Sequence, residues 1–353
     1  MNDREVGARA RALRVAVVGL GYFSQFHLQA WAANGDVELV GVCDQQAEVA
    51  ERVGEAHGVP HALGLEGLPA ASGLDIVDII APPVAHLALV RQSLAPGRLV
   101  ICQKPFCESI AEAETLLAEA DAVGARIVIH ENFRFQPWHR EVHDVLKTGV
   151  LGQVYQARFA LRPGDGQGPD AYLARQPAFQ RMPKLLIHET GVHFVDLFRW
   201  WFGEIDSVYA DLRRLNPVIA GEDAGLLIMH HADGVQSVFD GNRLADHAAA
   251  NRRHTMGELV IEGSQGELRL DGDGLLFRRA YGAQDWVAVP VTRPVDDTQF
   301  GGGCVAALIN HAVAAHRLGQ PPENALAEYL PVMRATEAAY TSAAEGRRVA
   351  LAG

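Results

Sequence analysis

The sequence lacks the features that mark secreted and membrane-spanning proteins. Its 353 residues include 4 cysteines, with no C-x-x-C pair and no metal-binding spacing, so we expect reduced thiols in a cytoplasmic protein. No apolar stretch approaches the roughly 18 to 20 residues that cross a membrane. The opening MNDREVG lacks the charged-then-apolar order of a secretion signal. The sequence therefore predicts a soluble, cytoplasmic protein without a membrane partner.

Positive charge is also scarce. Lys and Arg number 31 against 43 Asp and Glu, which gives a formal net charge of −12. Nucleic acids and anionic membranes are bound by clustered Lys and Arg. The only local basic cluster, GARARALR at residues 7–14, is typical of a solvated tail. We therefore expect no nucleic-acid partner.

Material for hydrophobic cores is abundant. Hydrophobic residues make up 48% of the chain and charged residues 21%, which is a globular composition. A chain of this length exceeds the size that one core usually serves, so we expect two domains. The pattern of the sequence changes near Pro137, which predicts domains at 12–136 and 137–353.

An apolar run followed by glycines lies near the start of the first domain. Val15–Val18 is typical of a strand buried on both faces. Phe23, Phe26, Ala30 and Ala33 then recur at three- and four-residue steps, which predicts a short helix with these residues on its apolar side. At such a strand-to-helix turn, Gly19 permits a tight bend and Gly21 lets the backbone approach a pyrophosphate. Ser24 takes the third position of this G-x-G-x-x-G-like pattern, where its small side chain predicts a slightly wider helix-to-strand contact. A glycine loop without a ligand is the alternative.

The next apolar run, VELVGVCD, ends on Asp44, twenty residues beyond Ser24. At this distance a carboxylate accepts a hydrogen bond from a ribose 2′-hydroxyl and repels a 2′-phosphate. Gln45 and Gln46 follow in place of an arginine. The pattern favours NAD over NADP, with an ordinary strand-ending aspartate as the alternative.

Three further strands are predicted in DIVDIIAPP, GRLVICQKPF and RIVIHENFRF, with helical segments between them. Alternating strands and helices predict an α/β fold with a doubly wound parallel sheet, in which ligands bind at the carboxyl ends of the strands. The polar residues and prolines at these ends are Pro82, Pro83, His86, Gln103, Lys104, His130, Asn132 and Arg134. For His86 and His130 a helix-capping role, and for Arg134 a structural ion pair, are equally compatible with the sequence.

Beyond residue 137 the strands follow one another with glycine-rich turns, which predicts an antiparallel or mixed sheet. The stretch RPGDGQGPDAYLARQPAFQ from Arg162 is predicted to be an exposed loop, either a lid or a disordered surface segment. Two helices, over residues 305–318 and 325–345, close the chain. Few helices remain to cover both faces of the sheet, so we expect a homodimer or homotetramer formed through it.

Seven motifs run in order along nearly the whole chain: VAVVGLGYFSQFH, VDIIAPPVAH, CQKPF, ENFRFQP, HETGVHFVDLFRWWFG, IEGSQGELRL and AAYTSAAEGRRVAL. Together they resemble the family of glucose-fructose oxidoreductase, inositol 2-dehydrogenase and MocA-like proteins. The resemblance implies an N-terminal Rossmann domain that binds NAD(P). It also implies a C-terminal α/β domain whose large, mostly antiparallel open sheet forms the subunit interface.

The resemblance also implies two sets of ligand-binding residues. The cofactor, NAD in preference to NADP, is expected to contact Gly19, Gly21, Tyr22, Phe23, Ser24, Asp44, Ala81, Pro82, His86, Gln103 and Lys104. A sugar or polyol substrate is expected to contact Lys104, His130, Asn132, Arg134, Glu189 and His193.

The catalytic residues implied by the resemblance are Lys104, Glu189 and His193. The family's Glu-Lys-Pro motif maps to residues 103–105, where an amide replaces the acid, and its Asp-x-x-x-His pair maps to Glu189 and His193. An imidazole can take a hydroxyl proton near neutral pH, and the Lys104 cation can stabilise negative charge on the same oxygen. Glu189 and His193 lie four apart in a predicted helix and so share one face.

No metal is expected, because His188 and His193 are five apart and break the H-E-x-x-H spacing.

The cofactor-binding and catalytic residues together predict an NAD-dependent dehydrogenase that acts on a secondary hydroxyl of a sugar, cyclitol or related polyol. Two alternatives stay open. One is an NAD-dependent glycosidase on the same fold, and the other is an NAD-binding regulator without catalytic activity.

Overall fold

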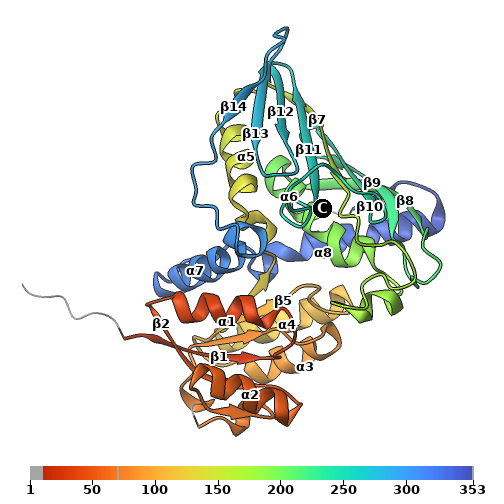
Figure 1. Ribbon diagram of the computed structural model, residues 1–353. Helices are drawn as coiled ribbons and strands as arrows, with labels where there is room; N and C mark the ends of the chain where they lie inside the picture. The colour runs from red at the N-terminus through yellow and green to blue at the C-terminus, as the bar shows by residue number, and fades with distance from the viewer. Residues whose placement is uncertain (1–10, 70, 352–353) are drawn as a thin grey trace, which may run out of the picture. The chain divides into compact units, whose positions relative to one another are not determined.

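The computed structural model describes residues 11–69 and 71–351, which form two compact units (Figure 1). The first unit runs to Ile129 and also takes in Ile309–Ala325. The second unit comprises His130–Leu308 and the chain from Leu326. Each unit is built around one sheet, so the predicted α/β class is confirmed. The limits 12–136 and 137–353 stay a prediction of domain extent.

The sheet of the first unit has the strand order β3-β2-β1-β4-β5-β6 in the described part of the chain. The order reverses between β1 and β4, and the carboxyl ends of these two strands are where doubly wound folds bind dinucleotides. The strands are β1 (Leu13–Val18), β2 (Val37–Cys43), β3 (His61–Ala62), β4 (Ile76–Ile79), β5 (Leu99–Gln103) and β6 (Arg126–His130).

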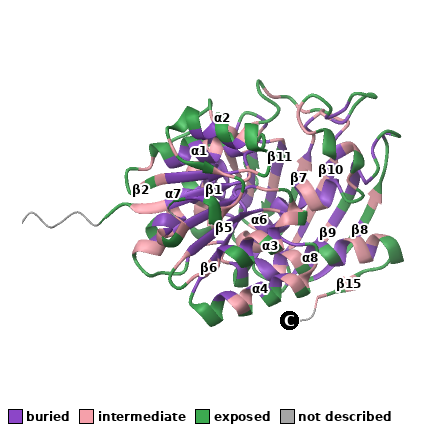
Figure 2. Ribbon diagram, turned by 90° about the horizontal axis from the view of Figure 1, so that it is seen from below, coloured by how far each residue is buried: buried purple, intermediate pink, exposed green. Residues whose placement is uncertain are grey.

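Helices lie on both faces of this sheet, with α1 and α2 on one side and α3 and α4 on the other (Figure 2). This double cover explains why β4 and β5 are buried along their whole length and consist mainly of Ile, Val and Leu. The helices are α1 (Ser24–Ala33), α2 (Ala47–His57), α3 (Pro83–Ser93) and α4 (Ile110–Val123). Gly124 ends α4 in the left-handed conformation, which glycine adopts without strain.

Two details near the N-terminus differ from the sequence-based predictions. The helix α1 buries His27, Leu28, Ala30 and Trp31, whereas the predicted apolar side placed Phe26 inward, which is only half-buried. A buried polar network, described below, sets this orientation. The basic cluster at 7–14 begins outside the described residues, and its last two residues belong to β1.

The second unit contains a mixed sheet of order β14-β13-β12-β11-β7-β10-β9-β8-β15 within the described residues. β7 and β10 are parallel neighbours, and the other pairs are antiparallel. The strands are β7 (Val154–Leu161), β8 (Ile205–Arg213), β9 (Ala224–His231), β10 (Gln236–Asn242), β11 (Gly257–Gly263), β12 (Gly266–Leu270), β13 (Leu276–Ala280), β14 (Val287–Val289) and β15 (Val349–Ala350).

One face of this sheet packs against helices. The ring of Phe194 in α6 (Val192–Phe202) stacks on Phe159 of β7 at 3.9 Å and on Phe239 of β10 at 5.2 Å between centroids. The long helix α8 (Leu326–Glu345) packs against β8, where Ser342 Oγ accepts a 2.9 Å hydrogen bond from the Ala210 amide. The remaining helices are α5 (Pro137–Lys147) and α7 (Cys304–Arg317). The two predicted closing helices are thereby confirmed.

The segment from Arg162 is more ordered than the sequence predicts. Instead of an exposed loop, it contributes Ala171, Tyr172 and Phe179 to a small buried cluster with Leu185 and Ile219. Aromatic residues among its glycines provide enough apolar surface to form this cluster.

Candidate functional site

Gly19 shapes the predicted phosphate-binding turn. Its φ is +89°, and a Cβ added there would lie 2.6 Å from the amide nitrogen of Ala81, closer than real Cβ contacts. At Gly21 an added Cβ would meet nothing within 4 Å. Open space therefore lies beside the backbone just before α1, as a pyrophosphate requires. Ser24 is buried and donates a 2.7 Å hydrogen bond to the carbonyl of Gly21, so a small polar side chain fits at the third position.

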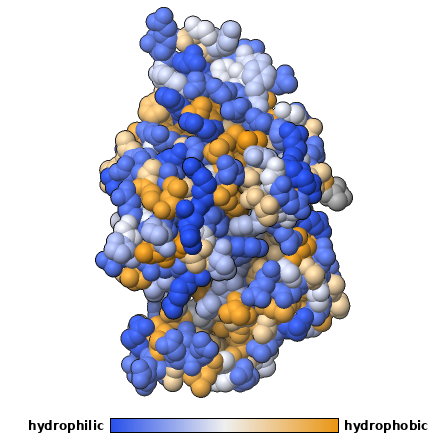
Figure 3. Space-filling view, turned by 90° about the vertical axis from the view of Figure 1, so that its right-hand side faces the viewer, coloured by the Kyte–Doolittle hydropathy of each residue, from blue (hydrophilic) through white to orange (hydrophobic). Residues whose placement is uncertain are grey.

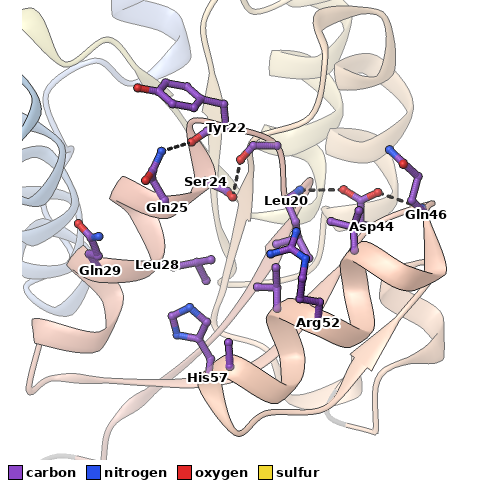
Figure 4. Close-up of a pocket in the computed structure, with 14 residues that line it drawn as sticks. Leu20, Tyr22, Ser24, Gln25, Leu28, Gln29, Asp44, Gln46, Arg52 and His57 are labelled. Atoms are coloured by element: carbon purple, nitrogen blue, oxygen red, sulfur yellow. Dashed lines mark hydrogen bonds between the residues drawn. The ribbon is translucent and has the colours of Figure 1, made fainter. Parts of the chain in front are cut away.

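The carboxylate of Asp44 lies beside this turn and is held by main-chain groups (Figure 4). One oxygen accepts a hydrogen bond from the Leu20 amide and the other from the Gln46 amide, both at 2.9 Å. Each oxygen has a further lone pair, so the carboxylate can still accept hydrogen bonds from ribose hydroxyls. The turn and Asp44 therefore fit the adenosine and pyrophosphate parts of NAD.

A cavity of 510 Å³ extends from Asp44 between α1 and α2. Arg52 and His57 of α2 line it together with Asp44 (Figure 4). The guanidinium of Arg52 makes no hydrogen bond or ion pair with any described residue. This cation was missed by the sequence analysis, because it follows Asp44 by eight residues on the next helix.

A fully buried polar chain lies beneath the end of β5. Gln103 Nε2 lies 2.8 Å from His27 Nε2, and His27 Nδ1 lies 2.8 Å from Asp78 Oδ2. Trp31 donates a 2.7 Å hydrogen bond to the same oxygen of Asp78. With Gln103 as the donor, His27 carries its proton on Nδ1 and donates it to Asp78. The amide at position 103 is therefore part of this buried hydrogen-bonded chain, and Lys104 follows it directly at the strand end.

His86 is buried with both ring nitrogens against backbone carbonyls, those of Ala81 and Phe106, each at 2.8 Å. Burial lowers the pKa of His86. These contacts link the end of β4 to the segment after β5. Pro82 caps α3, as its fixed φ allows. Cofactor contact by His86, Ala81 and Pro82 stays a prediction, as it does for the exposed Tyr22.

In the second unit, His193 is bound to a carboxylate that the sequence analysis did not select. His193 Nδ1 forms a short hydrogen bond with Glu131 Oε1, and both side chains are buried. The ring of Phe133 stacks on the His193 imidazole at 3.8 Å between centroids with an interplanar angle of 2°. These contacts fix the position and rotation of the imidazole.

Arg134 forms the structural ion pair that the sequence left open. Its guanidinium donates two 2.6 Å hydrogen bonds to Asp196, and both side chains are buried. Burial raises the pKa of Asp196, and the charge of Arg134 opposes this effect. His130 and Asn132, on the same segment, are also buried. Substrate contact by these residues stays a prediction.

Glu189 lies half-buried on a π-helical segment, Leu186–Gly191, that leads into α6. The predicted single helix through Glu189 and His193 is therefore corrected, because the helical hydrogen-bond pattern changes between them. π-turns occur frequently at functional sites.

Side chains from three other segments hold the π-helical segment. Glu222 accepts a 3.1 Å hydrogen bond from the Ile187 amide, and the hydroxyl of Tyr340 accepts one of 3.0 Å from the His188 amide. The buried guanidinium of Arg243 donates to Thr190 at 2.7 Å. Arg243 also donates to Asp165 and the Tyr172 hydroxyl, both at 2.8 Å, so it ties the loop after β7 to this segment.

Glu131 is the main functional residue that the sequence reasoning missed. The signal was its place at the carboxyl end of a strand, between His130 and Asn132, which were both selected. Its partner His193 is 62 residues away in the chain, so the pair cannot be recognised from the spacing of residues in a short motif.

Two features are absent from residues 11–69 and 71–351. No helix there is long and apolar enough to cross a membrane. No group of three or more His, Cys, Asp or Glu side chains there is arranged to hold a metal ion.

Two family profiles match the chain. An oxidoreductase family with an NAD-binding Rossmann fold (GFO_IDH_MocA) matches residues 13–131, and the GFO/IDH/MocA C-terminal domain matches residues 139–269. The D-apiose dehydrogenase of Paraburkholderia graminis is 31% identical over 95% of this chain and 89% of its own length. The D-apiose dehydrogenase of Rhizobium rhizogenes is 30% identical, covering 96% of this chain and 97% of its own.

Among solved structures, an oxidoreductase from Agrobacterium radiobacter has a TM-score of 0.87 and 26% identity. The match covers 96% of this chain and 98% of that chain, and that protein was crystallised with NAD+, L-tartaric acid and magnesium. The fold is therefore shared along nearly the whole chain.

Proposed function

Because the chain belongs to the Gfo/Idh/MocA oxidoreductase family and its first unit is an NAD-binding Rossmann domain, we propose that it oxidises one secondary hydroxyl of a sugar, cyclitol or related polyol. Two relatives that are at least 30% identical over nearly the whole chain are D-apiose dehydrogenases, which supports a CH–OH group as the target. The observation that carries the proposal is the buried histidine His193, fixed at one ring nitrogen by a carboxylate.

Oxidation of a secondary alcohol removes a proton from the oxygen and a hydride from the carbon. When bound, NAD supplies the acceptor for the hydride. His193 takes the hydroxyl proton at Nε2, since Nδ1 is bonded to Glu131. The Lys104 ammonium donates a hydrogen bond to the same oxygen and stabilises its developing negative charge. Glu189 binds the substrate beside this oxygen.

The proposed cofactor contacts in the first unit are those of the glycine turn and the strand ends. The backbone at Gly19 and Gly21 and the N-terminus of α1 bind the pyrophosphate, and Asp44 accepts hydrogen bonds from the ribose. Asp44 favours NAD by charge repulsion of a 2′-phosphate. Arg52 lines the same cavity, and its positive charge attracts a 2′-phosphate, so it opposes the preference for NAD.

The test is a panel of polyols and sugars, including D-apiose and inositol, offered with NAD. NADH that accumulates in proportion to an oxidised product supports the proposal. Release of the leaving group of a glycoside without net NADH would favour an NAD-dependent glycosidase instead. NAD binding without turnover of any compound in either assay would favour a regulator.

We also infer that the protein is a homodimer or homotetramer formed through the sheet of the second unit. Tyr209 and Leu226 are exposed on neighbouring strands β8 and β9. In the space-filling view, hydrophobic side chains gather in groups between hydrophilic ones on the face that carries these strands (Figure 3). Light scattering at working concentration tests this inference, and a particle of 38.2 kDa would contradict it.

A further inference from the structure

The carboxylate of Glu131 is wholly enclosed at the end of β6, and its neighbour His193 comes from the start of α6. We propose that Glu131 is the positioning residue of this histidine: it fixes the imidazole with its proton on Nδ1 and stabilises the imidazolium that forms when Nε2 takes a substrate proton. The role in proton transfer rests on the proposed function. The hydrogen bond between Glu131 and His193 does not depend on it.

The geometry restrains the imidazole along two directions. Glu131 binds Nδ1 at the ring edge, and Phe133 covers one face of the ring in a parallel stack. Phe133 also donates its backbone amide to Glu131 Oε1 at 3.3 Å, so one residue supports both partners. An acceptor fixed on Nδ1 selects the tautomer whose Nε2 has a free lone pair for a proton.

Two titratable groups beside Glu131, a phenol and a thiol, stay neutral. Burial, and then the charge of Glu131, raise the pKa of the Tyr329 phenol well above its ordinary value. The same two causes raise the pKa of the Cys304 thiol. Tyr329 and Cys304 therefore stay protonated and neutral beside the carboxylate.

Two further titratable side chains, Asp196 and His139, lie near the pair. Asp196 is paired with the guanidinium of Arg134. Burial lowers the pKa of His139 to about 3, so this ring is neutral, and its Nδ1 donates to the carbonyl of Phe133. A positive charge formed on His193 lies directly beside the Glu131 carboxylate, which stabilises it.

The proton balance is simple. The hydroxyl proton moves to Nε2 of His193, the O–H bond breaks and an N–H bond forms, and the Nδ1 proton stays shared with Glu131. Glu131 takes up no proton in this step.

Two substitutions separate charge from geometry. Glu131→Gln keeps a hydrogen-bond acceptor of the same size but removes the charge, and Glu131→Met removes both. We expect kcat to fall by roughly 10-fold to 10²-fold in the first and by on the order of 10² to 10⁴ in the second, with KM for NAD unchanged. In Glu131→Gln the acidic limb of the kcat/KM profile for oxidation should move about 1 to 3 units to lower pH, because the imidazolium loses its counter-charge.

The matched control is Glu141→Gln, which removes another buried glutamate of the same unit, one that accepts from Thr292. It should leave the pH profile in place. Glu131→Asp should retain part of the wild-type kcat. An unshifted acidic limb and wild-type kcat in Glu131→Gln would overturn the proposal.

A second readout needs no cofactor and no substrate. In ¹⁵N-histidine-labelled protein, with the His193 signals assigned by their loss in His193→Asn, the wild type should show Nδ1 protonated and Nε2 unprotonated. Glu131→Met should show mixed tautomers. A wild-type His193 protonated on Nε2 would overturn the pairing even if the enzyme oxidises polyols. If His193 shows the expected tautomer but the protein oxidises no polyol or sugar, the proposed function is refuted and the pairing of His193 with Glu131 stands.

Discussion

The two units hold their polar groups in different ways. In the first unit the main chain sets the arrangement: Gly19 bends the strand end, and the amides of Leu20 and Gln46 fix the carboxylate of Asp44. In the second unit side chains hold one another, as Glu131 holds His193.

The difference decides which substitutions each region tolerates. Where the main chain sets a site, an added Cβ is the damaging change, because the backbone has no room to yield. Where buried side chains pair with one another, the loss of either partner leaves a charge or polar group without its match. The four predictions below test this contrast.

The largest effect is expected from the side chains that touch the reacting oxygen. His193→Ala and Lys104→Ala should each lower kcat by on the order of 10² to 10⁴, the usual scale for losing a positioned proton acceptor or a charge-stabilising donor. The double variant should be barely worse than either single one, since the two act as a unit. Calorimetric titration should find the Kd for NAD little changed. Normal turnover by Lys104→Ala would remove that lysine from the mechanism.

Next in size is a comparison of two glycines in one turn. Gly19→Ala places a Cβ 2.6 Å from a backbone nitrogen at a φ of +89°, so we expect a loss of about 1 to 3 kcal/mol or more in the free energy of unfolding. Gly21→Ala has open space and should unfold in urea like the wild type, yet bind NAD more weakly. Equal stability of both variants would contradict a site set by the main chain.

A buried neutral histidine should make stability depend on pH. Burial lowers the pKa of His139 to about 3, against about 6.5 in the unfolded chain. Its contribution is present above pH 6.5 and is lost as the pH falls toward 3, because the unfolded chain then binds a proton that the folded one does not. Urea unfolding should show about 1.4 kcal/mol lost per pH unit from this residue.

His139→Gln should be less stable at pH 7 but should lose less stability between pH 6 and 4 than the wild type. The exposed His57 supplies the control, since His57→Gln should leave the slope unchanged. Parallel slopes in the wild type and His139→Gln would show that this ring is not held neutral.

The smallest effect concerns the choice of cofactor. The wild type should bind NAD more tightly than NADP, and Asp44→Ser should narrow the gap by about tenfold or less, as expected for a partly exposed charge. Arg52 should then favour NADP, so Arg52→Ala in the Asp44→Ser background should widen the gap again. Equal affinity of the wild type for both cofactors would refute the role of Asp44.

The sequence was a good guide to the first unit because local spacing encodes a main-chain site. The turn at Gly19 and the acidic residue at Asp44 both lie where the pattern predicts. The orientation of α1 was missed, because it depends on where His27 and Trp31 find a partner, and that partner is Asp78 on a distant strand.

The second unit was less predictable. Its strands and closing helices were recognisable from alternation and turn residues, but the carboxylate partner of His193 was not. Glu131 and Arg134 lie three residues apart, yet one bonds to His193 and the other to Asp196. Only packing in three dimensions distinguishes the two roles. The π-helical segment at Glu189 likewise depends on Glu222, Tyr340 and Arg243, which no local pattern connects with it.

The return of Ile309–Ala325 to the first unit bears on how the chain is synthesised. The amide of Ile129 donates to the carbonyl of Asn324 at 2.9 Å, and Arg126 binds the carbonyls of Gly319 and Gln320 at 3.0 Å. A ribosome must therefore reach residues 319–324 before the edge of the first sheet can close. Until then the edge strand β6 of the nucleotide-binding unit stays uncovered. The contacts that cover it join residues nearly two hundred positions apart, and contacts over such long separations slow folding.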